Sequence, residues 1–311
     1  MRRFLARRLL QSVLLLWVLM TFTFCLTRLA PGGPESMLLE QPKIQKVDLD
    51  RIRARFGLDD PLPLAYAKWL GNVLRLDFGM SYHYLRPPLE VIGERMWATV
   101  QLGALAYAIA LIGIPLGVAA ALNRGRLPDI SIRVFTVMSD AVPNWWMALV
   151  IIVALSTFAG WVPRGQGTEG PLDWFRHIII PAAILGLGGI VGFTRYVRSQ
   201  VLEVIGQDYV RTARAKGLTE LAVARDHILR NALLPLVTIF GGLLPALISG
   251  AALMEVIFAW PGMGRLYLDA ALSRDYPLLL AMITIATIAT LLGTLSADVM
   301  YGYVDPRIRY S

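Results

Sequence analysis

Residues 9–27 read Leu9-Leu-Gln-Ser-Val-Leu-Leu-Leu-Trp-Val-Leu-Met-Thr-Phe-Thr-Phe-Cys-Leu-Thr27 and contain no charged side chain, with Arg8 before them and Arg28 after them. A helix that crosses a bilayer needs about 20 predominantly apolar residues. The stretch therefore predicts a transmembrane helix. It decides the class of fold because further uncharged or nearly uncharged runs of similar length follow it along the chain.

Such runs dominate the 311-residue chain, of which 56% is hydrophobic and only 17% charged. A soluble protein could not solvate so much apolar surface. The fourth run is rich in glycine, and small residues let helix backbones approach closely, so we expect this run in the bundle interior. We predict an all-α integral membrane protein with six transmembrane helices, at residues 9–27, 96–123, 134–163, 177–194, 231–254 and 276–297.

The first run has two interpretations. Four N-terminal arginines before an apolar stretch are typical of a signal peptide, but this run exceeds the usual h-region and lacks a small-x-small cleavage site. We therefore expect a retained first span. Residues 1–30 are predicted to form a cytoplasmic N-terminus and that span, and six spans return the tail, residues 304–311, to the cytoplasm.

Basic residues in the short loops support this orientation. By the positive-inside rule, Lys and Arg concentrate on the cytoplasmic side. The chain carries a net charge of +8, which these topology signals explain, so we expect a lipid bilayer and not a nucleic acid as the partner. The basic residues of the loop between spans four and five are Arg195, Arg198, Arg211, Arg214, Lys216, Arg225 and Arg230.

The segment 31–95 is predicted to form a small external helical subdomain. Residues 48–56 have the pattern of a short helix that ends at Gly57, and residues 64–76 place apolar side chains at helical spacing. Its aromatic residues have two interpretations, contact with a partner or substrate and packing on the helix bundle. They are Tyr66, Trp69, Phe78, Tyr82 and Tyr84.

The loop 208–231 has the punctuation of two short helices. Asp208 is a suitable N-cap, Gly217 a suitable left-handed residue after the first helix, and Thr219 an N-cap for a second helix that begins at Glu220. By itself, such a loop is also explained as an ordinary solvated connection that carries positive-inside charge.

The loop resembles the cytoplasmic "EAA" loop of binding-protein-dependent ABC importer permeases. The general motif fits only at Ala213, Gly217 and Leu229, but the variant of the oligopeptide, dipeptide and nickel permeases is similar through Tyr209-Val-Arg-Thr-Ala-Arg-Ala-Lys-Gly-Leu and His227-x-Leu-Arg-Asn-Ala-Leu-Leu-Pro. Further similar motifs follow one another along the chain. They are Arg28-Leu-Ala-Pro-Gly-Gly-Pro, Asp77-Phe-Gly-Met-Ser, Arg95-Met-Trp-Ala-Thr, Glu255-Val-Ile-Phe-Ala-Trp-Pro-Gly-Met-Gly-Arg-Leu, Arg274-Asp-Tyr-Pro and Asp305-Pro-Arg-Ile-Arg.

The resemblance implies the type I ABC importer permease fold, with a five-helix core at residues 96–303, in a bacterial or archaeal cytoplasmic membrane. It also implies the partners: a second homologous permease subunit, two cytoplasmic ATPase subunits that bind ATP and magnesium, and an external substrate-binding protein. Peptides are the family's default substrate; nickel, glutathione and sugars are its alternatives. The implied ATPase-coupling residues are Asp208, Tyr209, Arg211, Ala213, Arg214, Lys216, Gly217, Leu218, His227 and Asn231.

The motif at residues 255–264 reads physically as a tight external turn. In the family it belongs to the external face, so a gate, a contact with the binding protein and a purely structural turn are the alternatives for Glu255, Trp260, Pro261, Gly262 and Gly264.

Two acids, Asp140 and Asp298, lie at or near membrane depth, where a functional role is the default hypothesis. They leave open an ion-coupled carrier or channel and, more remotely, an intramembrane aspartyl protease. For Asp140 the other interpretation is acceptance of backbone amides freed by Pro143. The chain has no P-loop and no catalytic residues are expected in it. Its one cysteine and three scattered histidines predict neither a disulfide nor a metal site.

Overall fold

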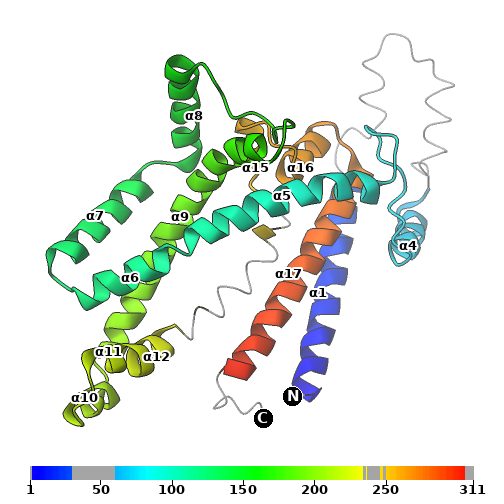
Figure 1. Ribbon diagram of the computed structural model, residues 1–311. Coiled ribbons are helices and arrows are strands. Elements are labelled where there is room, and N and C mark those ends of the chain that lie inside the picture. The colour runs from blue at the N-terminus through cyan, green and yellow to red at the C-terminus, as the bar shows by residue number, and fades with distance from the viewer. Residues whose placement is uncertain (1, 30–59, 234–235, 237–245, 248–249, 305–311) are drawn as a thin grey trace.

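A computed structural model describes residues 2–29, 60–233, 236, 246–247 and 250–304 (Figure 1), and all regular structure in these residues is helical. The all-α prediction is therefore confirmed for this part of the chain. The elements are α1 (Arg2–Leu29), α4 (Leu62–Val73), α5 (Pro88–Ala110), α6 (Gly113–Leu122), α7 (Leu127–Ala141), α8 (Asn144–Ala154), the π-helical turn η1 (Leu155–Ala159), α9 (Pro171–Ile205), α10 (Asp208–Ala215), α11 (Glu220–Ala222), the π-helical η2 (Val223–Leu229), α12 (Arg230–Ala232), α15 (Ala252–Ile257), α16 (Met263–Leu272) and α17 (Tyr276–Val304).

Four of the predicted spans, the first, second, fourth and sixth, coincide with these helices. The stretches 88–122, 171–205 and 276–296 are each long and apolar enough to cross a membrane, while the apolar part of α1 is the shorter stretch 10–25. The predicted fifth span, residues 231–254, lies mostly outside the described residues, as does the predicted helix at 48–56. Because α5 begins at Pro88, the boundary placed between residues 95 and 96 falls inside a continuous helix.

The predicted third span is not one straight helix. Helices α7 and α8 meet at an angle of 86°. Pro143 has no N–H group, and a proline disfavours helical geometry in the residue before it. Val142 is accordingly extended, with φ −105° and ψ 118°, and this single residue ends α7.

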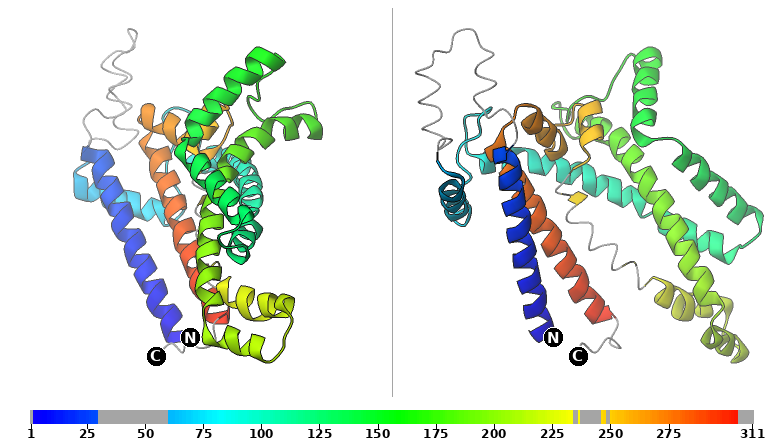
Figure 2. Two further views of the ribbon diagram at one scale, coloured as in Figure 1. Left: turned by 90° about the vertical axis from the view of Figure 1, so that its left-hand side faces the viewer. Right: turned by 180° about the vertical axis from the view of Figure 1, so that it is seen from behind.

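Helix α9 lies at the centre of the described bundle, against α5, α6 and α7 (Figure 2). A Cβ added to Gly186 would lie 2.7 Å from Ile109 Cγ2, and one added to Gly189 would lie 2.4 Å from Ala110 Cβ. These two glycines therefore permit close contact with α5, in agreement with the predicted place of this span in the bundle interior. A Cβ added to Gly192, in contrast, would meet no atom within 4 Å.

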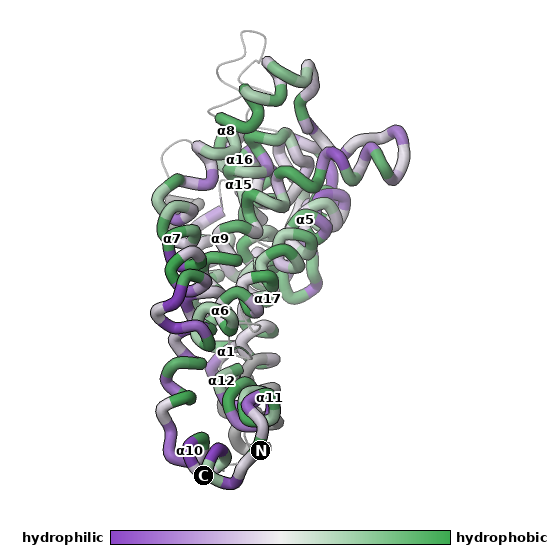
Figure 3. Tube along the Cα trace, turned by 60° about the vertical axis from the view of Figure 1, so that its left-hand side comes forward, coloured by the Kyte–Doolittle hydropathy of each residue, from purple (hydrophilic) through white to green (hydrophobic). Residues whose placement is uncertain are grey.

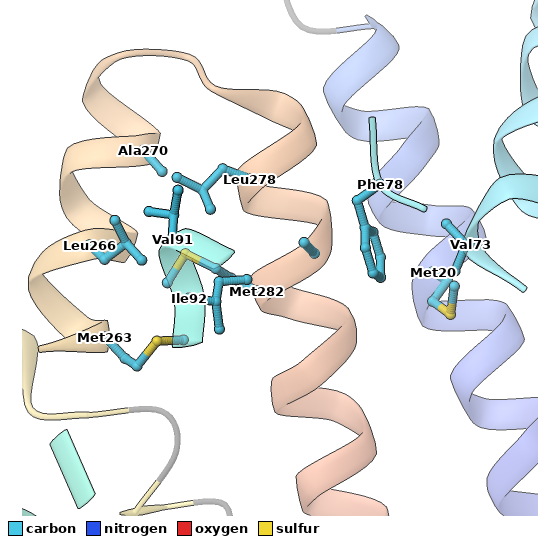
Figure 4. Packing of buried hydrophobic residues seen from close by; sticks show 11 residues of the cluster. Met20, Val73, Phe78, Val91, Ile92, Met263, Leu266, Ala270, Leu278 and Met282 are labelled. Atoms are coloured by element: carbon cyan, nitrogen blue, oxygen red, sulfur yellow. The ribbon is translucent and has the colours of Figure 1, made fainter. Parts of the chain in front are cut away.

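The described part of the segment that is predicted to be external, residues 60–95, packs on the ends of α1, α16 and α17. Phe78 lies between α17 and α1, while Val73, at the end of α4, contacts Met20 of α1 (Figure 4). The buried carboxylate of Asp275, just before α17, accepts hydrogen bonds from Ser81 Oγ and from the His83 amide. Bundle packing thus accounts for Tyr66, Trp69, Phe78 and Tyr84, and α4 confirms the helix predicted near residues 64–76.

Hydrophilic residues gather around α10–α12 and at the turn between α6 and α7, whereas the middle of the long helices is hydrophobic (Figure 3). The start of α1, the end of α17 and the elements α10–α12 lie at the same end of the molecule (Figure 1). The segments that the sequence predicts to be cytoplasmic are therefore grouped together.

Candidate functional site

Residues 208–232 form a helical hairpin, here called the charged hairpin. Its first helix begins one residue earlier than the predicted cap implies: Gln207 is the N-cap, with an extended backbone, and its carbonyl accepts from the Val210 and Arg211 amides. Asp208 therefore occupies the first helical turn, where its negative charge is favourable to the helix dipole.

The turn of the charged hairpin is built as predicted. Gly217 has φ +78°, the left-handed conformation that glycine adopts without strain. Thr219 is the N-cap of the second helix, and its side chain accepts from the Ala222 amide at 3.4 Å. Across this turn the Arg214 guanidinium bonds both carboxylate oxygens of Glu220, at 2.9 and 3.2 Å. The glycine and the threonine cap thus build the turn, and an exposed ion pair spans it.

The inner face of the charged hairpin is apolar. Val210 and Val223 are fully buried, and Ile228 is nearly so, in a cluster that also contains Val197 and Val201 of α9. The hairpin and the end of α9 therefore form one packed unit. Ala213 belongs to the same cluster, so its side chain packs inside the hairpin and is not presented to a partner.

The outer face is charged, with a few exposed apolar side chains. Leu221 is 81% exposed, and Tyr209 and Leu218 are each exposed by about two fifths. Arg225 bonds Asp226 and holds the pKa of that carboxyl below its ordinary value. Of the other predicted coupling residues, Arg211, Lys216 and Asn231 are exposed and His227 is half-buried; the amide of Asn231 donates to the His227 carbonyl.

At the opposite end, the Glu255 carboxylate is fully buried. It accepts hydrogen bonds from Thr99 Oγ1 at 2.9 Å, the Arg265 amide at 2.9 Å and the Ala251 amide at 3.4 Å. Thr99 Oγ1 in turn accepts from the Met263 amide. One carboxylate thus joins α5, α15 and the start of α16.

The other residues of the motif at residues 255–264 are also enclosed. Trp260 is fully buried and donates from Nε1 to the Ala98 carbonyl at 2.8 Å; Gly262 and Gly264 are buried, and Pro261 is half-buried. A docking protein would therefore meet the surface around Glu255 and Trp260, not these two side chains. The geometry accounts for the tight-turn interpretation of the motif.

We expect Gly262→Ala to destabilise this turn. A Cβ at residue 262 would lie 2.4 Å from Glu255 Cδ, whereas φ is −101° and imposes no strain on alanine. Overpacking of a buried site costs about 1–3 kcal/mol. Thermal unfolding of the purified transporter should show a lower midpoint for Gly262→Ala. The control Gly192→Ala, whose Cβ meets nothing within 4 Å, should leave the midpoint equal or raise it; equal midpoints for both variants would contradict the expectation.

Beside Glu255 lies a cavity of about 290 Å³. Its described lining is mostly apolar and comes from α5, from α9 and from the residues before α15; Thr99, Tyr107 and Glu255 supply polar groups. The cavity is lined by α5 and α9, which pack closely against each other, and by the carboxylate that joins three elements. A displacement of α9 against α5 would change its shape.

The acids at membrane depth have different surroundings. Asp140 bonds Arg195 of α9 at 2.8 Å, so it does not serve the backbone amides freed at Pro143. The side chain of Asp298 lies outside the described residues. Within the described residues, no group of three His, Cys, Asp or Glu side chains is placed to hold a metal ion.

The most enclosed ion pair was not expected from the sequence. Asp129 is 1% exposed and receives two hydrogen bonds from Arg198, at 2.7 and 3.0 Å, and one from the Gly125 amide at 3.0 Å. The pair ties the turn between α6 and α7 to α9, at the residue that follows Val197 of the hairpin cluster. Its only sequence signal is an acid in a basic loop.

Comparisons with known proteins agree with this architecture. Residues 113–310 match the model of the family described as binding-protein-dependent transport system inner membrane component, and residues 1–103 match the model of its N-terminal region. The chain is 40% identical to the oligopeptide transport system permease protein AppB of Bacillus subtilis and 33% identical to OppB of Haemophilus influenzae, over the full length of each. An inward-facing structure of the MetNI methionine ABC transporter has a TM-score of 0.56 at 17% identity, over 70% of this chain and 97% of that chain.

The long apolar helices and the matches to permeases together identify a membrane permease subunit of a transport system. The chain belongs to the family of binding-protein-dependent transport system inner membrane components. It is the transmembrane permease subunit of an ABC importer.

Proposed function

We propose that this permease imports peptides and that its charged hairpin couples it to a cytoplasmic ATPase subunit. The observation that carries the coupling role is the shared cluster of Val210, Val223 and Ile228 with Val197 and Val201, because it makes the hairpin a rigid extension of α9. The peptide substrate is supported by the relatives, whose names describe oligopeptide and peptide transport.

In this proposal, ATP and magnesium bind to two ATPase subunits, and a second permease subunit completes the pathway. Closure of the ATPase subunits on nucleotide moves the hairpin, α9 follows, and the cavity between α9 and α5 changes shape. Nucleotide drives the change only because it binds one arrangement more tightly than the other. An external binding protein delivers the substrate, and both termini lie on the hairpin side.

The carrier and protease alternatives rest on acids at membrane depth. Asp140 forms an ion pair with Arg195 at 2.8 Å, and this contact accounts for the acid without a role in transport or catalysis. This pairing and the family of the chain both favour ATP-driven import.

The coupling role predicts that Leu221→Asp weakens association with the ATPase. Leu221 is the most exposed apolar side chain of the hairpin, at 81%, and an interface loses apolar contact when a charge replaces such a residue. Copurification of the ATPase subunit with the permease from membranes should fall at least about fivefold, a change of about 1 kcal/mol.

Leu172→Asp is the matched control, since Leu172 is 65% exposed at the opposite end of α9. This variant should retain the ATPase. Equal retention by both variants would argue against the hairpin as the docking element, while loss in both would indicate a general folding defect.

A further inference from the structure

Helix α4 (Leu62–Val73), in the external segment, lies crosswise against the last turns of α1 in all views (Figures 1 and 2). The hydroxyl of Tyr66 is 2.6 Å from Thr21 Oγ1. The rings of Trp69 and Phe24 are 4.9 Å apart, and Val73 packs with Met20. Three successive contacts thus fix the position of α4 along α1.

The depth of these contacts follows from the apolar run of α1. That run ends at Thr27, because Arg28 follows, and Thr21 lies six residues before its end. At 1.5 Å per residue, Thr21 is about 9 Å below the external limit of the run. A helix tilt of about 20° changes this depth by less than about 1 Å. Near this depth, Phe22 is 61% exposed, and Val18, about 4.5 Å deeper than Thr21, is 47% exposed, as expected for side chains that face lipid.

The side chains of α4 are sorted into three faces. Tyr66, Trp69 and Val73 pack toward α1. Lys68 and Asn72 are four residues apart and exposed, and they form a narrow polar line. The third face has helical spacing and no polar side chain, and it is exposed; its members are Leu64, Ala67, Gly71 and Leu74.

We propose that the face formed by Leu64, Ala67, Gly71 and Leu74 binds the outer surface of the lipid bilayer, so that α4 is an interfacial membrane anchor of the external segment. Helices of this kind insert their apolar face about 5–10 Å into the headgroup and acyl boundary, which is the depth that the contacts with α1 require. Tyr and Trp are the aromatic residues typical of this boundary. The polar line of Lys68 and Asn72 faces water and the headgroups.

The inference depends on the insertion of α1 in the membrane and not on the proposed substrate or coupling. Leu74 and Leu64, which are 79% and 47% exposed, would otherwise be apolar surface in water. The anchor fixes the height of the external segment above the bilayer. It thereby also fixes the height of the hydrogen bond from Ser81 to Asp275, just before α17.

Spin labels on single cysteines test the anchor in the assembled transporter, reconstituted in lipid nanodiscs. Cys25 is the one native cysteine and is first replaced by alanine. Labels are then placed by Leu64→Cys and Ala67→Cys on the apolar face, and by Lys68→Cys and Asn72→Cys on the polar line. Collision with oxygen, which dissolves in lipid, is compared with collision with a water-soluble nickel chelate.

We expect oxygen to relax the labels at 64 and 67 several times more effectively than nickel does, and the order to reverse at 68 and 72. Equal nickel access at all four positions would place α4 in water and overturn the proposal. Labels at 64 and 67 shielded from both reagents would reveal a protein partner, such as the second permease subunit, and would also overturn it. Two positions on each face guard against a label that perturbs the fold.

Discussion

Gly217→Val is expected to abolish coupled uptake while the ATPase subunits continue to hydrolyse ATP. Residue 217 has φ +78°, and a Cβ there would meet no atom within 4 Å, so the effect arises from the backbone and not from a clash. A left-handed conformation costs an L-residue about 1–2 kcal/mol, and a β-branched residue is a clear outlier there.

Valine can relieve this strain only by leaving the turn. The Gly217 amide would then lose its hydrogen bond to the Arg214 carbonyl, now 2.9 Å, and the ion pair between Arg214 and Glu220 would separate. The second half of the hairpin, with the exposed Leu221, would be reoriented relative to α10. If the charged hairpin meets the ATPase subunit at the wrong angle, movement of that subunit is not transmitted to α9.

Substrate uptake and ATP hydrolysis are measured together in vesicles that contain the reconstituted transporter. Uptake per ATP hydrolysed should fall at least about tenfold, the factor that corresponds to about 1.4 kcal/mol. Gly217→Asn is the matched control because asparagine tolerates the left-handed conformation, and it should retain most of the uptake. If the valine variant takes up as much substrate as the unchanged protein, the charged hairpin does not transmit movement from the ATPase to α9.

The turn at Gly217 illustrates what could be predicted from the sequence. A glycine after a helix and a threonine before the next one carry their structural meaning within a few residues, and the structure confirms both. The apolar runs are equally local signals, and they predicted the helices α1, α5, α9 and α17. The break at Pro143 is local too, although its 86° angle depends on how α8 packs.

Pairings between distant residues could not be predicted in this way. Thr99 and Glu255 are 156 residues apart, and Ser81 and Asp275 are 194 apart, so no spacing rule connects them. The π-helical turns of η2 also have no signal in the sequence pattern, which reads as an ordinary helix. Burial separated the candidate residues further, because it removed Ala213, Glu255 and Trp260 from the set that can touch a partner directly.

Asp129→Asn is expected to destabilise the permease more than any other single exchange of a carboxyl for an amide in the charged loops. Asp129 and Arg198 are 69 residues apart and form a two-bond pair in which the carboxylate is 1% exposed. Asparagine keeps one acceptor but turns an N–H donor toward the guanidinium. Removing one partner of a fully buried pair costs about 3–5 kcal/mol. Arg198 is 22% exposed and keeps access to water, so we expect a smaller cost of about 1–3 kcal/mol.

The Arg225–Asp226 pair is the matched control for this expectation. Its guanidinium also forms two bonds, at 2.8 and 3.1 Å, but its side chains are 77% and 49% exposed. Exposed pairs of this kind contribute about 0–1 kcal/mol, so Asp226→Asn should leave the thermal midpoint of the purified transporter nearly unchanged. Asp129→Asn should lower that midpoint by several degrees.

The position of the Asp129–Arg198 pair also predicts which part of the permease loosens first when the pair is lost. Arg198 follows Val197, which belongs to the cluster that joins the charged hairpin to α9, and Asp129 holds the Gly125 amide at the turn between α6 and α7. Loss of the carboxylate therefore frees the α6–α7 turn from α9, the helix on which the charged hairpin packs. Hydrogen exchange should rise first at residues 123–130, before the hairpin itself is exposed. Uniform exchange across α6, α7 and α9, with an unchanged midpoint, would show that apolar packing alone holds α7 in place.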